Sequence, residues 1–432
     1  MSDTIVRSNE VTTKAAQESY GRPLAVVTTL FFMWGFLTCL NDILVPHLKA
    51  IFALNYAQVM LVQFSFFSAY FLFSIPAAKV VDWIGYQRTM VAGLLTMAAG
   101  ALLFVPAASL ASYPIFLTAL IILAAGITAL QVAANPYVIA LGPSQTASSR
   151  LNLTQAFNSL GTTIAPKIGG LLILSTVPLT ALEIQSLSPP ALQVYRAQQA
   201  SSVKIPYVVI GVLLMLLALV IGRSRLPKIA AARHPLGEDV NDSLWKHRNL
   251  ILGALGIFCY VGAEVSIGSF LVNYFGQPNI AGLVPEVAAG FVTFYWGGAM
   301  VGRFVGSGLL RKIRTGHLLA ICAVCAIALV MTSMLTYGRL AMWSMLAVGL
   351  FNSIMFASIF ALGLAELGPL AGDASGILNM AIVGGAVVPL VQGVIADRIG
   401  IHHAFFMPIL CYLYILFYAL IGSRPNSERV AI

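Results

Sequence analysis

Apolar segments long enough to cross a lipid bilayer follow one another along almost the whole chain. Only 9% of the 432 residues are charged and 59% are hydrophobic, whereas soluble proteins carry about 25% charged residues. A helix needs about 20 apolar residues to cross the hydrocarbon core of a membrane. The sequence therefore predicts an all-α membrane protein with about twelve transmembrane helices.

Among the predicted loops on the side of the membrane that holds both termini, the longest is a polar and basic segment near the middle of the chain. This segment separates two sets of six helices, so we expect two six-helix bundles. The predicted units are an N-terminal segment at 1–23, a first bundle at 24–222, a linker at 223–248, a second bundle at 249–422 and a tail at 423–432. The predicted spans are 24–48, 57–80, 89–110, 113–141, 149–175, 205–222, 249–275, 287–310, 316–336, 340–366, 375–396 and 401–422.

The net charge of +9 has a topological explanation. Most Lys and Arg residues fall in loops on the side of the membrane that also holds both termini, and such an excess marks the cytoplasmic side. We therefore expect a multi-pass protein with cytoplasmic N- and C-termini. Its partners are expected to be the lipid bilayer and a solute, with no nucleic acid. The first 20 residues lack the basic region and apolar core of a cleaved signal peptide.

The two halves share a spacing of helix-bending residues. Gly161-x4-Pro166-x3-Gly170 in the fifth span matches Gly384-x4-Pro389-x3-Gly393 in the eleventh. Equivalent helices in two halves are typical of transporters built from parallel repeats, as in the major facilitator fold. We therefore predict two pseudo-symmetric bundles.

Five amide side chains lie in two of the predicted spans. Gln131 and Asn135 share one helix face because they are four residues apart, and Asn152, Gln155 and Asn158 share a face of the next span. An amide without a partner in hydrocarbon costs several kcal/mol, so these faces should line a cavity. Amides donate and accept hydrogen bonds without carrying charge. They favour a neutral, hydroxyl-rich substrate, and we predict all five as substrate-binding residues.

Two carboxylates lie at similar depths in the first span of each half. Asp42 follows Asn41, and Glu264 lies in the seventh span. A central charge costs about 2.5–3.5 kcal/mol on insertion scales, so a function or a partner is expected. We predict Asp42 and Glu264 as cation-coupling residues and Asn41 as a substrate-binding residue. Asp42 can carry a proton or hold a sodium ion with neighbouring oxygens; a structural role near a helix end is the alternative. For Glu264, the alternative to coupling or solute contact is a structural hydrogen bond or ion pair.

Four other charged residues are predicted to act as gates or structural charges. Lys167 and Arg303 lie within spans, and Asp82 and Arg88 lie in the loop after the second span. Lys167 either extends toward the interface or pairs with a carboxylate. No His, Cys and acidic residues form a metal-ligand set, so no cofactor or resident metal is predicted beside the coupling ion.

Aromatic side chains offer an apolar surface on which a sugar ring can stack. Trp296, beside Tyr295 in the middle of the eighth span, is the best-placed candidate. Packing or interface anchoring is the alternative role for any aromatic residue in a span.

Several of these motifs resemble the fucose:proton symporter family of the major facilitator superfamily. The similar segments are Leu40-Asn-Asp-Ile-Leu44, Gln131-Val-Ala-Ala-Asn-Pro136, Leu141-Gly142-Pro143, Arg150-Leu-Asn-Leu-Thr-Gln-Ala-Phe-Asn-Ser-Leu-Gly161 and Cys259-Tyr-Val-Gly-Ala263. The resemblance implies a central cavity, cation-coupled monosaccharide uptake across a bacterial inner membrane, and an essential acid at Asp42. A second essential family carboxylate is replaced here by Gln131. This form is more similar to the family's glucose/galactose branch, and we infer that Glu264 takes over the coupling role.

The sequence thus predicts a monomeric secondary active transporter, not an enzyme, that imports a neutral hexose with a proton or sodium ion. Glucose or galactose is the expected substrate, with fucose or N-acetylglucosamine as alternatives. A drug or metabolite antiporter on the same fold would need a larger, more apolar cavity. A membrane enzyme would need a set of catalytic groups that the sequence lacks. A sugar sensor would usually add a soluble output domain. If Asp42 is purely structural, the protein would be a uniporter.

Overall fold

The structure is a computed structural model in which every regular element of the described chain is a helix. This confirms the predicted fold class. The described residues are 20–37, 39, 56–110, 112–173, 186–229 and 244–423, without the side chains of 56–63, 166–173, 196, 199–203, 285, 286 and 369.

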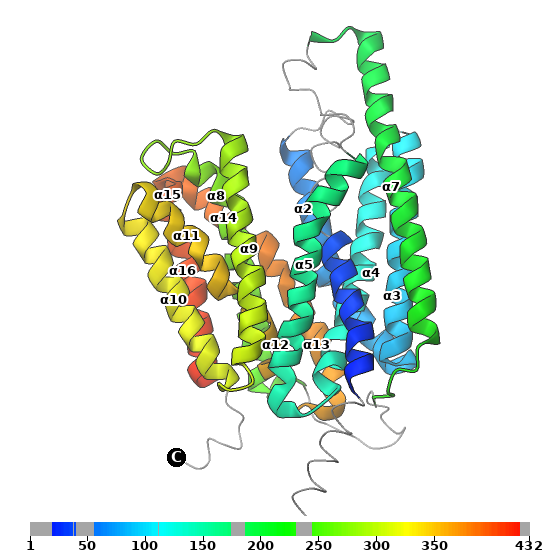
Figure 1. The fold of residues 1–432 in the computed structure, drawn as a ribbon, viewed down its shortest axis with the longest axis vertical. Helices are drawn as coiled ribbons and strands as arrows, with labels where there is room; N and C mark the ends of the chain where they lie inside the picture. Colours follow the sequence, from blue (N-terminus) through cyan, green and yellow to red (C-terminus); the bar gives the residue numbers. More distant parts are fainter. Residues whose placement is uncertain are drawn as a thin grey trace, which may run out of the picture.

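The helices form two bundles that stand side by side (Figure 1). The first contains a helix over residues 20–37 together with α2 (Tyr56–Ile84), α3 (Tyr86–Ser109), α4 (Tyr113–Ala140), η1 (Ser144–Thr146), α5 (Ala147–Ile173) and α7 (Pro189–Arg223). The second contains α8 (Arg248–Phe275), α9 (Pro285–Leu309), α10 (Thr315–Leu335), α11 (Gly338–Asn352), α12 (Met355–Gly363), α13 (Ala371–Met380), α14 (Gly384–Ile399), α15 (Ile401–Ala404) and α16 (Phe406–Phe417). Short elements η2 (Leu244–Lys246), η3 (Gly368–Leu370), η4 (Ala381–Val383) and η5 (Tyr418–Gly422) lie at helix ends and junctions.

Nine helical segments of the described residues are long and apolar enough to cross a membrane. They correspond to nine of the predicted spans. The remaining three predicted spans fall on the helix over residues 20–37, on α5 and on α9, which are helical where the structure describes them.

The matched glycines of the sequence repeat make the same kind of contact in each half. A Cβ on Gly161 of α5 would overlap the Phe32 carbonyl oxygen, and one on Gly384 of α14 would overlap the Phe258 carbonyl oxygen. In each half the glycine therefore lets this helix touch the backbone of the half's first helix. The shared contact supports the predicted pseudo-symmetry.

Two spans of the second half are interrupted at the level of the molecular centre. Ser353 and Ile354 separate α11 from α12, and η4 separates α13 from α14. Such interruptions are tolerated within a membrane where the backbone lines a cavity. The two breaks place Phe356 and Ile382 at the same cavity, described below.

The two halves meet mainly toward one end of the molecule. We call this the linker end, because α7 ends and α8 begins there; the opposite end is the far end (Figure 1). Near the linker end, the Ser149 hydroxyl donates to the Ser307 carbonyl at 2.6 Å, and the Thr315 and Ser148 hydroxyls lie 3.0 Å apart. The Ser375 hydroxyl donates to the Val132 carbonyl at 2.9 Å. These bonds hold the halves together beneath the centre.

Candidate functional site

A cavity of about 150 Å³ lies between the two halves. Its volume is close to that of a cavity of about 150 Å³ known to hold one benzene ring. The lining residues come from both bundles: Trp34, Tyr70, Gln131, Gln155, Asn158, Tyr260, Val261, Glu264, Arg303, Phe356 and Ile382. A single six-membered ring is therefore the size of ligand that the cavity fits.

The first half contributes the amide wall of this cavity. Gln131 donates its Nε2 to the Tyr70 hydroxyl at 2.7 Å, while its buried Oε1 has no hydrogen-bond partner. The Nε2 of Gln155, which is 6% exposed, also has no partner. Asn158 donates to the Phe31 carbonyl at 2.9 Å. One acceptor and one donor thus remain available to a ligand.

The second half contributes a charged pair. The Tyr260 hydroxyl donates to Glu264 Oε1 at 2.7 Å, and Arg303 Nη2 lies 3.5 Å from the same oxygen. The side chains of Glu264 and Arg303 are each only 13% exposed. Each charge compensates the other, which lowers the cost of holding both within the membrane. The lining therefore carries no net formal charge.

Arg303 also connects the two halves. Its Nη1 donates to the Ser159 hydroxyl on α5, and its Nε donates to the Ser353 carbonyl at 3.2 Å. The main-chain carbonyl of Arg303 accepts a bond from Asn152 Nδ2 at 2.7 Å. This one residue thus joins the carboxylate of Glu264 to a helix of the opposite bundle.

A hydrogen-bonded chain behind the cavity holds Glu264 in place. The Tyr295 hydroxyl donates to the Glu264 carbonyl at 3.3 Å and accepts a bond from Asn352 Nδ2 at 2.8 Å. The Tyr412 hydroxyl donates to Asn352 Oδ1 at 2.7 Å. Both amide atoms of Asn352 are therefore satisfied, and the chain ties α8 to α9, α11 and α16.

The structure brings five of the predicted site residues together at the cavity: Gln131, Gln155, Asn158, Glu264 and Arg303. Asn135 and Asn152 do not line it and are fully buried nearby. Trp296 does not line it either, and it is 41% exposed. It precedes Arg303 by seven residues on α9, which places it on a similar face of the helix but nearer the far end. Asn41, Asp42 and the side chain of Lys167 lie outside the described residues.

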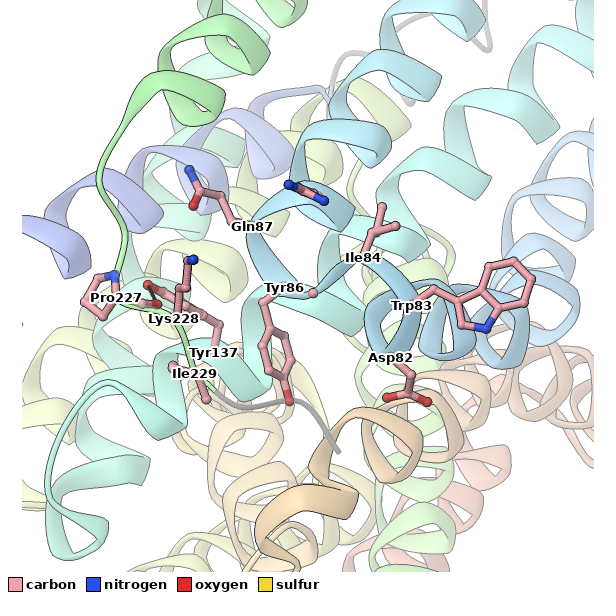
Figure 2. Close-up of a pocket in the computed structure, with 11 residues that line it drawn as sticks. Asp82, Trp83, Ile84, Tyr86, Gln87, Tyr137, Pro227, Lys228 and Ile229 are labelled. Carbon is pink, nitrogen blue, oxygen red and sulfur yellow. Dashed lines mark hydrogen bonds between the residues drawn. The ribbon is translucent and has the colours of Figure 1, made fainter. Parts of the chain in front are cut away.

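Asp82 and Arg88 lie at the linker end, beside a separate cavity of about 540 Å³ (Figure 2). A Cβ on Gly372 would lie 3.2 Å from Asp82 Oδ1, so this carboxylate reaches the first turn of α13 in the other half. The partial positive charge of a helix N-terminus favours a carboxylate there. Gln87 donates from Nε2 to the carbonyls of Ile221 and Ser224, at 2.8 Å each. This loop therefore connects α2 and α3 to both α7 and the second half.

Two site residues have roles that the sequence did not reveal. Tyr70 is one of many aromatic residues in the predicted spans, and nothing in the sequence distinguishes it, yet its hydroxyl orients Gln131. Ser159 was not identified at all, although it receives Arg303. Ser159 lies four residues after Gln155 on α5, so helical periodicity was the available signal.

An all-helical, two-bundle membrane fold with a polar cavity lined by both bundles at their interface is typical of a membrane transporter. The sequence model of the Major Facilitator Superfamily matches residues 26–388. The chain belongs to this superfamily, whose members are transporters rather than enzymes.

Individual relatives cover nearly the whole chain. The Glucose/galactose transporter of Brucella abortus biovar 1 (strain 9-941) is 51% identical over 425 residues, which is 98% of this chain and 100% of that protein. The L-fucose-proton symporter of Escherichia coli (strain K12) is 35% identical over 421 residues, 95% of each chain. The crystal structure of FucP, a Major Facilitator Superfamily transporter in the outward conformation, has 34% sequence identity and a TM-score of 0.87. The match covers 94% of this chain and 100% of the FucP chain.

Proposed function

We propose that this protein imports a neutral hexose of the glucose/galactose type together with a proton, by alternating access. The observation that carries the proposal is the cavity with its unpartnered amide atoms, Gln131 Oε1 and Gln155 Nε2. Buried polar groups in proteins are normally satisfied. A sugar hydroxyl both donates and accepts hydrogen bonds, so it can bond to an unpartnered amide nitrogen or to an unpartnered amide oxygen.

The remaining lining of the cavity suits the rest of a sugar. Trp34, Tyr260 and Phe356 offer aromatic surface for the apolar face of a pyranose ring. The Glu264–Arg303 pair contributes no net formal charge, which suits a neutral substrate. The relatives named for glucose and galactose, and the one named as a fucose-proton symporter, support the same substrate class and a proton as the coupling ion.

Among the described residues, we assign Glu264 to proton coupling. Protonation removes its charge, and the attraction that holds Arg303 then weakens. Arg303 also bonds to Ser159 in the other half, so its release would loosen the contact between the halves. Asp42 remains the second coupling residue predicted from the sequence.

The proposed orientation places both termini and the linker end in the cytoplasm of a bacterial cell, with the protein in the inner membrane. The halves are bonded at the linker end, so the cavity would face outward in this structure. One chain supplies the whole cavity, which is consistent with a monomer. One proton entering across about 100 mV supplies about 2.3 kcal/mol, enough to concentrate a neutral sugar roughly fiftyfold.

The test is uptake of labelled hexoses into proteoliposomes, with a pH gradient and a sodium gradient imposed separately. We expect D-glucose or D-galactose to accumulate under the pH gradient and not under the sodium gradient. Glu264→Gln should abolish accumulation but retain exchange of sugar between the two sides. The proposal would be contradicted if no hexose accumulates under the pH gradient, or if Glu264→Gln accumulates sugar as fully as the wild type.

A further inference from the structure

Two fully buried asparagines lie one helical turn below the cavity's two unpartnered glutamines. Asn135 follows Gln131 by four residues on α4, which runs toward the linker end. Asn152 precedes Gln155 by three residues on α5, which runs away from the linker end. Residues three or four apart share a helix face, so each asparagine lies under its glutamine on the linker side.

The amide atoms of these asparagines are poorly satisfied. Neither Nδ2 nor Oδ1 of Asn135 has a hydrogen-bond partner, although the residue is 0% exposed. Asn152 donates its Nδ2 to the Arg303 carbonyl, but its Oδ1 has no partner. Leaving buried amides unpaired costs folding free energy, and such groups in a native protein require an explanation.

The position of the contacts between the halves supplies that explanation. The bond between Ser149 and the Ser307 carbonyl closes the linker side beneath Asn152 in this structure. The bond from Ser375 to the Val132 carbonyl joins the halves between the levels of Gln131 and Asn135 on α4. The bond from Asn152 to Arg303 also crosses between the halves. When the halves part at the linker end, that bond breaks, and both amide groups of Asn135 and Asn152 become available to a solute.

From this arrangement we infer that Asn135 and Asn152 form a second hexose subsite on the linker side of the cavity. It is closed in this structure and is completed when the linker end opens. The inference rests on the proposed function, because it assigns the same sugar a position on its way out of the cavity. The unpaired amides destabilise the closed form and become satisfied by sugar hydroxyls in the open form.

Asn352 provides a matched control within the same protein. It is also an asparagine that is 0% exposed in a span, but Tyr295 and Tyr412 satisfy both of its amide atoms. Replacing Asn352 with the similarly sized, apolar Leu leaves the buried Tyr412 hydroxyl without its acceptor. It also removes the bond that the Tyr295 hydroxyl accepts, although this hydroxyl still donates to the Glu264 carbonyl. The same replacement at Asn135 removes two atoms that already lack partners, so it should not destabilise the closed form.

The experiment compares Asn135→Leu, Asn135→Ser and Asn352→Leu with the wild type. Thermal unfolding is measured for each, together with D-galactose binding from the far side and the half-saturating galactose concentration for efflux from the linker side. We expect Asn135→Leu to unfold at the wild-type temperature or above it. Its dissociation constant for galactose bound from the far side should stay within about twofold of the wild-type value. The half-saturating galactose concentration for efflux from the linker side should rise about tenfold, which corresponds to the loss of one hydrogen bond. Asn135→Ser should show a smaller rise.

Three results would overturn the subsite. They are an equal loss of affinity on both sides, a fall in unfolding temperature as large as that of Asn352→Leu, and an unchanged linker-side half-saturation. A wild-type protein that binds and transports no hexose would remove the proposed function and the subsite together. A wild type that transports galactose while Asn135→Leu behaves identically would remove the subsite alone.

Discussion

The polar side chains around the cavity are bonded differently in the two halves. In the second half, Asn352 has both amide atoms satisfied, and Glu264 accepts from Tyr260 and pairs with Arg303. In the first half, Gln131 and Gln155 line the same cavity but retain unpartnered amide atoms.

This difference separates groups that hold the structure from groups that are free to bind. A satisfied polar network orders its members, whereas an unsatisfied buried atom has hydrogen-bonding capacity for a ligand. The contrast applies to the residues around the cavity that are named above. Other buried side chains of the second half also have an atom without a partner, and none of them lines the cavity: Ser266, Ser358, Asn379 and Gln392.

The largest expected effect comes from breaking the charge pair of the second half. Arg303→Met leaves Glu264 as an uncompensated buried charge, which costs about 3–5 kcal/mol of folding free energy. We expect a markedly lower unfolding temperature and loss of transport. The double variant Arg303→Met/Glu264→Met should recover stability without recovering sugar accumulation. Recovery of accumulation by the double variant would show that the pair has no part in coupling.

A smaller effect, on binding alone, is expected from Gln155→Leu in the first half. The replacement removes a free donor, and losing one hydrogen bond to a sugar of about 1.4 kcal/mol weakens binding about tenfold. Stability should be unchanged, because Gln155 Nε2 has no partner to abandon. Isothermal titration with D-galactose and thermal unfolding measure the two quantities. A large fall in the unfolding temperature would assign Gln155 to the scaffold instead.

Removing the aromatic ring of Phe356 should weaken binding less. Aromatic contacts contribute about 0.5–1.5 kcal/mol beyond the area that they bury, so Phe356→Leu should raise the galactose dissociation constant severalfold. Gln155→Leu, measured in parallel, provides the reference for a lost hydrogen bond. Unchanged affinity would place the sugar against another part of the cavity wall.

The smallest effect is expected at Trp296, which lies toward the far end and does not line the cavity. Trp296→Phe should alter the galactose dissociation constant by less than about twofold, since it keeps an aromatic ring and removes no lining contact. A tenfold change, measured by the same titration, would move Trp296 into the binding site.

The sequence was sufficient to predict the fold class and much of the site, because both depend on local periodicity. Apolar segments of span length identified the helices, and i to i+4 spacing placed Gln131 and Asn135 on one face. The same periodicity could not assign depth. Gln131 lines the cavity and Asn135 lies beneath it because the packing of α13 against α4 sets the lower boundary.

Contacts distant in sequence account for what could not be predicted. Arg303 meets Ser159 across 144 residues, and Glu264 meets Arg303 across 39. The first pair depends on how the two bundles are aligned, and the second depends on how α8 and α9 are aligned. A single sequence carries no direct signal of either alignment. The partners of Arg303 and the role of Ser159 therefore emerge only from the structure.

The central claim is that the unpartnered amides of the first half bind the hexose. Its most direct test is the D-galactose dissociation constant of the double variant Gln131→Leu/Gln155→Leu, measured beside its unfolding temperature. We predict a dissociation constant at least about a hundredfold above that of the wild type, since two hydrogen bonds of about 1.4 kcal/mol each are lost. The unfolding temperature should be no lower than that of the single variant Gln131→Leu, which loses its bond to the Tyr70 hydroxyl. A dissociation constant within about twofold of the wild-type value would contradict the account.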